Sequence, residues 1–335
     1  MQTVYALPPD DARKLRFMYA QSGIEQRYSV IPDYSKALHE WKFYPPTENL
    51  EPFPTLEQRM AVYTRQAPLL SVDAIRDCLS HTHAPENITH LITVSCTGMS
   101  APGLDLQVMD LMDLPKTIFR TSINFMGCYA ALHALKLADA ICKAEKTANV
   151  LIVCTELCTL HFQKEATMDN MASSLLFGDG SAAVLVMHDE AKPEGLFMDG
   201  FYSEINPKGK RDMAWELSSS GFLMTLSGYI PELIEEDFAA ITEKALRKNG
   251  KSAGVISHWC IHPGGKKIVQ AIHKSLGFTN GQLQCSYDVL REFGNLSSAT
   301  ILFVLKRLME DKKPMNVFGA AFGPGLTVET FTAHR

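Results

Sequence analysis

The sequence lacks any apolar run long enough to cross a membrane. Its first residues, MQTVYALPPDDARK, are acidic where a secretory signal would be basic and then apolar. It also lacks an excess of basic charge, since 32 Lys and Arg face 37 Asp and Glu, a net charge of −5. Such a chain has no general attraction to nucleic acid or an anionic membrane. These absences predict a cytoplasmic protein without a nucleic-acid partner, in which local basic groups must bind any anionic ligand.

Paired cysteine spacings are absent as well. The eight cysteines include no CxxC pair, and several lie in apolar, strand-like runs. We therefore predict reduced thiols rather than a disulfide framework. Cys154, Cys158 and His161 are close in sequence, but a zinc site needs a second set of ligands that the spacing does not offer. We expect no metal.

The chain also contains no low-complexity segment and no Pro/Gly/Ser-rich linker. Its 335 residues are nevertheless more than a domain with a single hydrophobic core usually has. Helical apolar spacing extends over 56–80 and 231–249. Short apolar runs typical of buried strands in a parallel-type sheet lie at 91–95, 150–155, 182–187, 254–261 and 317–322. This alternation predicts an α/β fold.

An internal repeat appears when the sequence is shifted against itself by 167 positions. HLITVSCTG (90–98) then aligns with SHWCIHPGG (257–265), Gly127–Cys128 with Gly294–Asn295, and Asn149–Val150 with Asn316–Val317. The aligned features are a strand before a glycine turn, a glycine before a helix, and a helix before a strand. We predict two duplicated halves, 1–189 and 190–335, related by a pseudo-twofold axis that brings Cys128 and Asn295 to equivalent helix starts.

Cys128 is the first candidate for chemistry. It follows a strand-like stretch (121–125) and precedes an Ala/Leu-rich helix (129–143), so its thiol is expected near a helix N-terminus. The helix dipole there favours the thiolate and lowers the thiol pKa, as does a nearby imidazolium. An inert, packed cysteine is the alternative that the local sequence leaves open.

His262 and Asn295 have simpler explanations when each is taken alone. His262 ends a strand-like run before Pro-Gly-Gly and could be a structural hydrogen-bonding group, and Asn295 could be the N-cap of a helix over 296–309. The repeat, however, predicts that both side chains lie close to Cys128. A thiolate with two N–H donors suits acyl transfer from a thioester. The same donors would stabilise the enolate that forms when a β-carboxyl thioester loses CO₂.

Five motifs, in order, resemble the type III polyketide synthases, the chalcone synthase-like family. They are GCYAALHALKLA around Cys128, FGDGSAAVLV (177–186), HPGG (262–265), GNLSSATILFVL (294–305) and FGPGLTVE (322–329). The similarity covers nearly the whole chain. CTGMSAPG (96–103) and ELCTLHFQ (156–163) are more similar to the bacterial branch than to the plant one.

The resemblance implies a thiolase-like αβαβα fold in a homodimer, with Cys128, His262 and Asn295 as the catalytic triad. It also implies an acyltransferase that loads an acyl-CoA starter, decarboxylates malonyl-CoA, and extends and cyclises the chain to a pyrone, resorcinol or phloroglucinol type product. CoA thioesters are the substrates, and no metal or redox cofactor is used. The alternative is a β-ketoacyl carrier-protein synthase III-like enzyme that condenses once, although such enzymes carry an HQAN-like motif where this chain has HPGG.

The resemblance also assigns binding residues by position. Phe177 matches one of two gatekeeper phenylalanines, and the other is replaced by Met224. The cavity-lining positions fall on Cys96, Thr97, Glu156, Cys158, His161, Trp215, Phe222 and Ser297. Of the basic positions that meet CoA phosphates in the first helix, only Lys14 is kept. The candidates to replace the others are Arg13, Arg16, Lys266 and Lys267.

Overall fold

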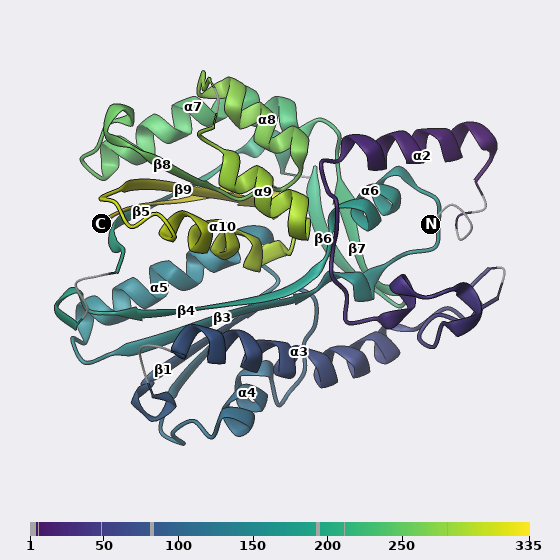
Figure 1. The fold of residues 1–335 in the computed structure, drawn as a ribbon, viewed down its shortest axis with the longest axis horizontal. Helices are drawn as coiled ribbons and strands as arrows, with labels where there is room; N and C mark the ends of the chain where they lie inside the picture. The colour runs from purple at the N-terminus through teal and green to yellow at the C-terminus, as the bar shows by residue number, and fades with distance from the viewer. Residues whose placement is uncertain are drawn as a thin grey trace.

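The computed structural model of the protein describes residues 5, 7–47, 49–80, 84–191, 195–210, 212–279 and 281–335. They form five stacked layers that alternate between helices and sheets (Figure 1). In order, the layers are helices α3 (Leu56–Leu79) and α4 (Leu104–Met112), a first sheet, helices α5 (Ala130–Ala144) and α10 (Thr300–Met309), a second sheet, and helices α7 (Ile230–Lys248) and α8 (Lys266–Ser275). The expected αβαβα layering is confirmed.

The two sheets have related topologies. The first has the order β2 (Phe119–Asn124), β1 (His90–Ser95), β3 (Asn149–Leu157), β4 (Asp179–Met187). The second has the order β5 (Phe197–Ile205), β10 (Thr327–His334), β9 (Asn316–Gly323), β8 (His258–Ile261). β1 is parallel to β2 and β3, and β8 is parallel to β9.

The expectation of parallel-type sheets holds for only some of the strand pairs. β4 is antiparallel to β3, and β10 is antiparallel to both β9 and β5. Only the short turn Pro324–Leu326 joins β9 to β10, and a connection of that length can form only an antiparallel pair. The periodicity of a buried strand does not reveal its direction.

The internal repeat is visible in the fold. β3 and β9 begin 167 residues apart and occupy the same place beside β1 and β8. Gly127 and Gly294 both have left-handed φ, 78° and 70°. A Cβ at Gly127 would lie 2.3 Å from the Pro324 ring, and one at Gly294 would lie 2.8 Å from the Leu176 carbonyl oxygen. Each half therefore needs glycine just before the position that carries Cys128 or Asn295.

Two predicted boundaries in the second half differ from the structure. β8 begins at His258 rather than residue 254, because 253–255 form a 3₁₀ turn. The final helix begins at Thr300 rather than 296, because a second 3₁₀ turn, Ser297–Ala299, precedes it. Asn295 therefore does not cap α10 itself.

The core is divided by the sheets. The largest cluster lies between them, where the Ala-rich face of α5 and the apolar face of α10 meet both inner sheet surfaces. Two further clusters lie under α3 and α4 and under α7 and α8. Outside the stack are α2 (Pro9–Gln21), α6 (Met168–Leu176), α9 (Gln284–Phe293) and the hairpin β6 (Met213–Ser218) and β7 (Gly221–Leu226). In the part of the chain that the structure describes, no helix is both long and apolar enough to cross a membrane.

Candidate active site

Cys128 lies at the central junction of the two halves. It sits in a 3₁₀ turn, Gly127–Tyr129, that leads directly into α5. The preceding Phe125 has φ 58°, a conformation that non-glycine residues rarely adopt and that is often found at functional sites. The Cys128 side chain keeps partial solvent exposure, as a nucleophile that meets a substrate requires.

Asn295 approaches Cys128 from the second half with a defined orientation. Its Oδ1 accepts hydrogen bonds from the Ser297 backbone N–H at 2.8 Å and from the Thr300 hydroxyl at 3.2 Å. These donors fix the oxygen, so Nδ2 is the end available as a donor. Nδ2 lies 3.9 Å from the Cys128 sulfur and donates to the Gly264 carbonyl at 3.4 Å.

His262 follows β8 and shares this neighbourhood. A Cβ on Gly264, the residue to which Asn295 donates, would lie 3.8 Å from His262 Nε2. The imidazole is 1% exposed, yet neither ring nitrogen has a hydrogen-bond partner among the described residues. Buried polar atoms are nearly always paired, so this pair of vacant positions requires an explanation.

Burial controls the charge state of both groups. It raises the pKa of the Cys128 thiol to about 12, partly offset by hydrogen bonds with Ser297 and Asn295. Burial also lowers the pKa of His262 to about 3. The sequence-based expectation of a depressed thiol pKa is therefore wrong for the free protein, because desolvation outweighs the helix dipole. At neutral pH the site holds a neutral thiol and a neutral imidazole, which can accept a proton.

Glu156, at the end of β3, links the two halves beneath the site. Its Oε2 accepts from the Cys96 backbone N–H at 2.9 Å and from the Thr97 hydroxyl at 2.8 Å. Its Oε1 accepts from the Ser298 hydroxyl, one residue beyond Ser297. Burial raises the pKa of Glu156, and these hydrogen bonds oppose the shift. The carboxyl group thus holds the turn after β1 and the turn before α10 together.

His161, Trp215 and Phe222 form one wall of the site. The imidazole of His161 stacks on the Phe222 ring, with centroids 4.2 Å apart and an angle of 8°, and Trp215 meets both rings edge-on. His161 Nε2 donates to the Thr97 carbonyl at 2.7 Å, and Trp215 Nε1 donates to the Cys96 carbonyl at 2.7 Å. These bonds attach the β6–β7 hairpin and the turn after β3 to the end of β1.

The remaining predicted cavity residues border the same region. Cys158 is buried in the 3₁₀ turn Cys158–His161 after β3. Phe177 forms an isolated parallel bridge with Asn295, which links the first half directly to the second. Met224 is half-buried on β7, where it pairs with Trp215. Every predicted cavity residue therefore lies on a turn or strand that contacts the triad or its wall.

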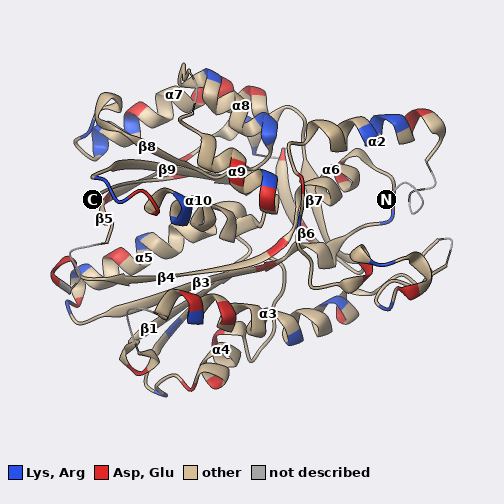
Figure 2. Ribbon diagram, viewed as in Figure 1, with Lys and Arg blue, Asp and Glu red and all other residues tan. Residues whose placement is uncertain are grey.

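The predicted CoA-binding bases lie elsewhere, at the surface. Figure 2 shows basic residues along α2 and at the start of α8. On α2, Lys14 pairs with Asp11 at 2.9 Å and Arg13 with Asp10 at 3.6 Å. Arg16 and Lys267 are exposed and form no ion pair with any described residue. The stem of Lys266 passes Gly23, so the start of α8 adjoins the end of α2.

The sequence did not single out three residues that help to build the site. Thr300 orients Asn295, Ser298 binds Glu156, and the Phe125 ring packs edge-on against Phe222 at 5.1 Å. Ser298 and Thr300 lie within GNLSSAT, and a run of hydroxyl side chains beside a candidate amide could have suggested hydrogen-bonding support. No local signal distinguishes Phe125. Among the described residues, no group of three or more His, Cys, Asp or Glu could hold a metal ion.

The five-layered α/β stack built from two related halves is the thiolase-like architecture, with Cys128 on one half and His262 and Asn295 on the other. Comparison with known proteins specifies the family. The model for the N-terminal domain of chalcone and stilbene synthases matches residues 8–190, and the model for their C-terminal domain matches 201–335. The chain therefore belongs to the chalcone and stilbene synthase family, the type III polyketide synthases, as its motifs suggested.

Individual relatives agree with this assignment. The chain is 28% identical over 332 residues to an α-pyrone synthesis polyketide synthase-like protein of Mycobacterium tuberculosis, covering 96% of this chain and 82% of the relative. It is 32% identical over 326 residues to Probable polyketide synthase 1 of Dictyostelium discoideum, covering 94% of this chain but only 10% of that much longer protein. The crystal structure of PKS-I from the brown alga Ectocarpus siliculosus superposes with a TM-score of 0.92 at 25% identity, covering 99% of this chain and 92% of that one.

Proposed function

We propose that this protein is a malonyl-CoA-dependent polyketide synthase in which Cys128 carries the growing acyl chain. In the loading step, the Cys128 sulfur attacks the carbonyl of an acyl-CoA starter while its proton passes to the neutral imidazole of His262. The C–S bond to CoA then breaks, and the departing thiolate takes the proton back from the imidazolium. The products are an acyl–Cys128 thioester and free CoA.

His262 and Asn295 then act on malonyl-CoA. Its thioester oxygen lies between Asn295 Nδ2–H and an imidazole N–H, and the C–C bond to the carboxylate breaks, so CO₂ leaves and the electron pair becomes an enolate. The two donors stabilise the negative oxygen. The enolate carbon attacks the acyl–Cys128 carbonyl, forms the new C–C bond and releases the Cys128 sulfur. Repetition and cyclisation in the same cavity give the product.

One observation carries this assignment. Both ring nitrogens of the buried His262 lack a partner among the described residues, and the Asn295 amide lies 3.9 Å from the Cys128 sulfur through both its nitrogen and its oxygen. A structural histidine would be hydrogen-bonded, whereas one that receives a thiol proton and then faces an oxyanion must keep its nitrogens available. The fixed Oδ1 of Asn295 supports the same role.

Separating the two half-reactions tests the roles. We expect Cys128→Ala to abolish condensation but to keep malonyl-CoA decarboxylation measurable. His262→Ala and Asn295→Ala should each reduce both reactions by roughly 100-fold or more, because each removes an oxyanion donor. CO₂ release from labelled malonyl-CoA and mass analysis of products measure the two steps. Unchanged decarboxylation in the His262 and Asn295 variants would contradict the assignment, and a product with only one extension would favour the carrier-protein synthase alternative.

We also propose a pyrone, resorcinol or phloroglucinol type product, and the likeness to an α-pyrone synthesis protein supports the first of these. The two halves are proposed to divide near residue 189, which is supported by the first family-model match ending at 190 and the second beginning at 201. The eight cysteines, which include no CxxC pair, support a reducing, cytoplasmic setting. As expected from the family, CoA thioesters serve as substrates, with no metal or redox cofactor.

A homodimer is the last part of the proposal. β2 is an edge strand of the first sheet, and Phe119, Arg120, Thr121 and Ser122 on it are exposed. An open edge strand can pair with another chain, and a second copy would cover it. Light scattering of the purified protein should give twice the chain mass, and a monomer at micromolar concentration would contradict this part.

A further inference from the structure

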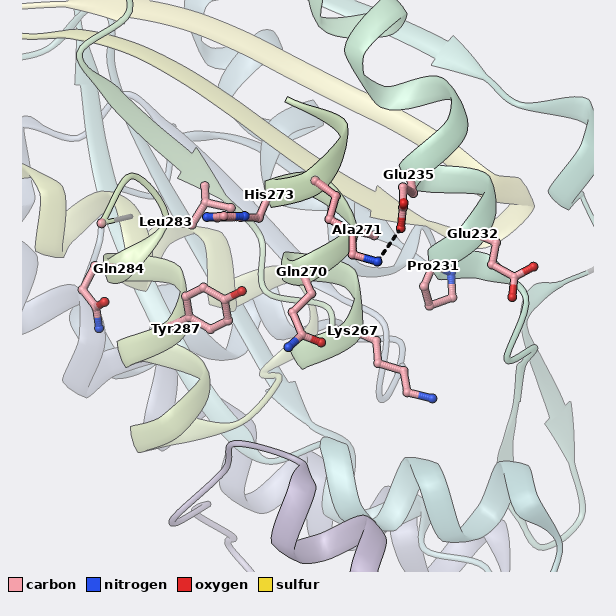
Figure 3. A pocket seen from close by; sticks show the side chains of 12 residues that line it. Pro231, Glu232, Glu235, Lys267, Gln270, Ala271, His273, Leu283, Gln284 and Tyr287 are labelled. Atoms are coloured by element: carbon pink, nitrogen blue, oxygen red, sulfur yellow. Dashed lines mark hydrogen bonds and ion pairs between the residues drawn. The ribbon is translucent and has the colours of Figure 1, made fainter. Parts of the chain in front are cut away.

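The seam where the two halves meet is a different place from the open hollow that Figure 3 shows. That hollow, of about 630 Å³, lies between α7, α8 and α9, and all the side chains that line it come from residues 231–287 of the second half. Its ion pair, Lys274–Glu235 at 3.3 Å, also stays within that half. A residue that holds Asn295 in place relative to Cys128 must instead contact both halves.

Residues 25–30, which we call the strap, follow α2 and cross the seam between α9 and α6 (Figure 1). On the second half, the Glu25 backbone N–H donates to the Arg291 carbonyl of α9 at 2.8 Å. On the first half, the Tyr28 carbonyl accepts from the Asp179 backbone N–H at 2.9 Å. The strap therefore attaches one chain segment to both halves.

Arg27, in the middle of the strap, binds the end of α6. Its Nη1 donates to the Phe177 carbonyl at 3.1 Å and also to the Ser174 carbonyl. The last carbonyls of a helix have no partner within it, and α6 has no basic residue in its last turn, so Arg27 supplies the cation that the negative end of the helix dipole favours. Its guanidinium forms no ion pair with any residue that the structure describes. The charge of Arg27 therefore acts on the helix end rather than on a carboxylate.

The stem of Arg27 lies against the segment that carries Asn295. A Cβ on Gly294 would lie 2.8 Å from Arg27 Cγ, and one on Gly178 would lie 3.4 Å from Arg27 Cβ. Beside these glycines, the Asn295 backbone N–H donates to the Leu176 carbonyl at 2.9 Å, and the Asn295 carbonyl accepts from the Gly178 N–H at 3.0 Å. Arg27 thus contacts both segments of the bridge that joins α6 to Asn295.

We propose that Arg27 is a positioning residue for Asn295. It holds the end of α6, whose Leu176 carbonyl holds the Asn295 backbone, and its stem fills the space beside Gly294. A misplacement of about 1 Å in a catalytic group can cost about 100-fold in rate, so a looser bridge should weaken the donation from Asn295 Nδ2. This role rests on the proposed function, because it assumes that Asn295 stabilises an enolate.

Two substitutions isolate the guanidinium. Arg27→Met keeps a stem against Gly294 but removes the donors, and it should lower kcat for malonyl-CoA decarboxylation about tenfold with KM within twofold of wild type, because oxyanion stabilisation is lost rather than substrate binding. Arg27→Lys keeps the charge on a more flexible stem and should lower kcat about threefold. CO₂ release from labelled malonyl-CoA measures both, normalised to folded protein by circular dichroism.

Arg335 offers the matched control. Its guanidinium likewise donates to carbonyls at a helix end, those of Met309 at 3.5 Å and Lys313 at 3.2 Å. These lie at and beyond the last residue of α10, whereas Asn295 precedes the first. Loss of either arginine should lower the urea midpoint, but Arg335→Met should keep the wild-type decarboxylation kcat.

The role of Arg27 is overturned if Arg27→Met keeps the wild-type kcat per folded molecule while only its urea midpoint falls, or if Arg335→Met loses as much activity. If Arg27→Met does not fold, Arg27→Lys decides, and a wild-type kcat in that variant overturns the role. A wild-type protein that does not decarboxylate malonyl-CoA contradicts the proposed function instead, so the two failures are distinguishable.

Discussion

Two buried histidines in this protein differ in one respect. His161 and His262 are 5% and 1% exposed, both lie in turns that follow strands, and burial lowers the pKa of each to about 3. His161 donates to the Thr97 carbonyl and accepts from the Phe222 backbone N–H at 3.1 Å. His262 has neither bond. Burial and pKa therefore do not distinguish these two histidines, whereas hydrogen-bond saturation does.

The difference has an energetic meaning. A buried polar group without a partner costs about 1–3 kcal/mol of stability, so His262 lowers the stability of the fold while His161 contributes to it. A destabilising arrangement that persists in a well-packed interior is expected where function requires it. The predictions below test this contrast by exchanging each imidazole for a phenyl ring.

The largest expected effect is on catalysis. His262→Phe should reduce malonyl-CoA decarboxylation by at least about 100-fold, because it removes both the base and an oxyanion donor. His161→Phe should stay within about tenfold of wild type per folded molecule, because its ring still stacks on Phe222. Rates normalised to folded protein by circular dichroism measure both. Equal losses in the two variants would remove the distinction between the histidines.

Stability should change in the opposite order. His161→Phe leaves the Thr97 carbonyl and the Phe222 N–H without partners, which should lower the free energy of unfolding by about 2–4 kcal/mol. His262→Phe removes two unpaired nitrogens, so its stability should equal or exceed that of wild type. Urea denaturation measures both values, provided that the protein concentration is held constant. A large loss in His262→Phe would mean that its imidazole has a partner in solution.

Acid should reveal the contribution of His262 to the pH dependence of stability. Its pKa is about 3 when folded and about 6.5 when unfolded, so below pH 6.5 the unfolded chain binds the extra proton and stability falls as pH falls. Each such histidine contributes about 1.4 kcal/mol per pH unit. Between pH 6.5 and 5.0, wild type should therefore lose about 1.6 kcal/mol more than His262→Phe, because the unfolded imidazole is already half protonated at pH 6.5. Parallel urea curves at the two pH values measure this difference, and a constant difference would contradict the lowered pKa.

The sequence was sufficient for the features that short patterns determine. The α/β class, the repeat at 167 and the glycines before Cys128 and Asn295 follow from periodicity and from the narrow conformational range of a glycine-dependent turn, whereas the five-layered arrangement came from the family resemblance. The family motifs then named the triad and the wall residues, and contacts join these residues in the structure. The direction of β4 and β10 did not follow, because alternation and burial are the same in parallel and antiparallel strands.

The charge states of the buried groups and the number of their hydrogen-bond partners could not be predicted from the sequence. For Cys128, the position of a helix start in the sequence suggested that the helix dipole would lower the thiol pKa. Desolvation by all the surrounding layers raises this pKa, and its effect is larger. Similarly, His161 and His262 each follow an apolar run, and only the packed structure shows which one has partners. Three-dimensional surroundings decide these properties, so no local motif encodes them.

The smallest expected effect concerns how Asn295 keeps its nitrogen available. Its Oδ1 is bonded by the Ser297 N–H and the Thr300 hydroxyl, so Thr300→Val removes one of the two bonds that orient the amide. The decarboxylation rate should fall about threefold to tenfold with little change in KM, because a partly misoriented amide affects the oxyanion rather than substrate binding. Thr300→Ser keeps the hydroxyl and should retain the wild-type rate.

Because the Thr300 hydroxyl also contacts the Leu296 N–H and the Ser297 carbonyl, a purely structural role predicts a lower unfolding free energy with an unchanged rate per folded molecule. A kcat reduction that serine rescues would show that the asparagine, like His262, functions through the polar atom that the fold leaves free.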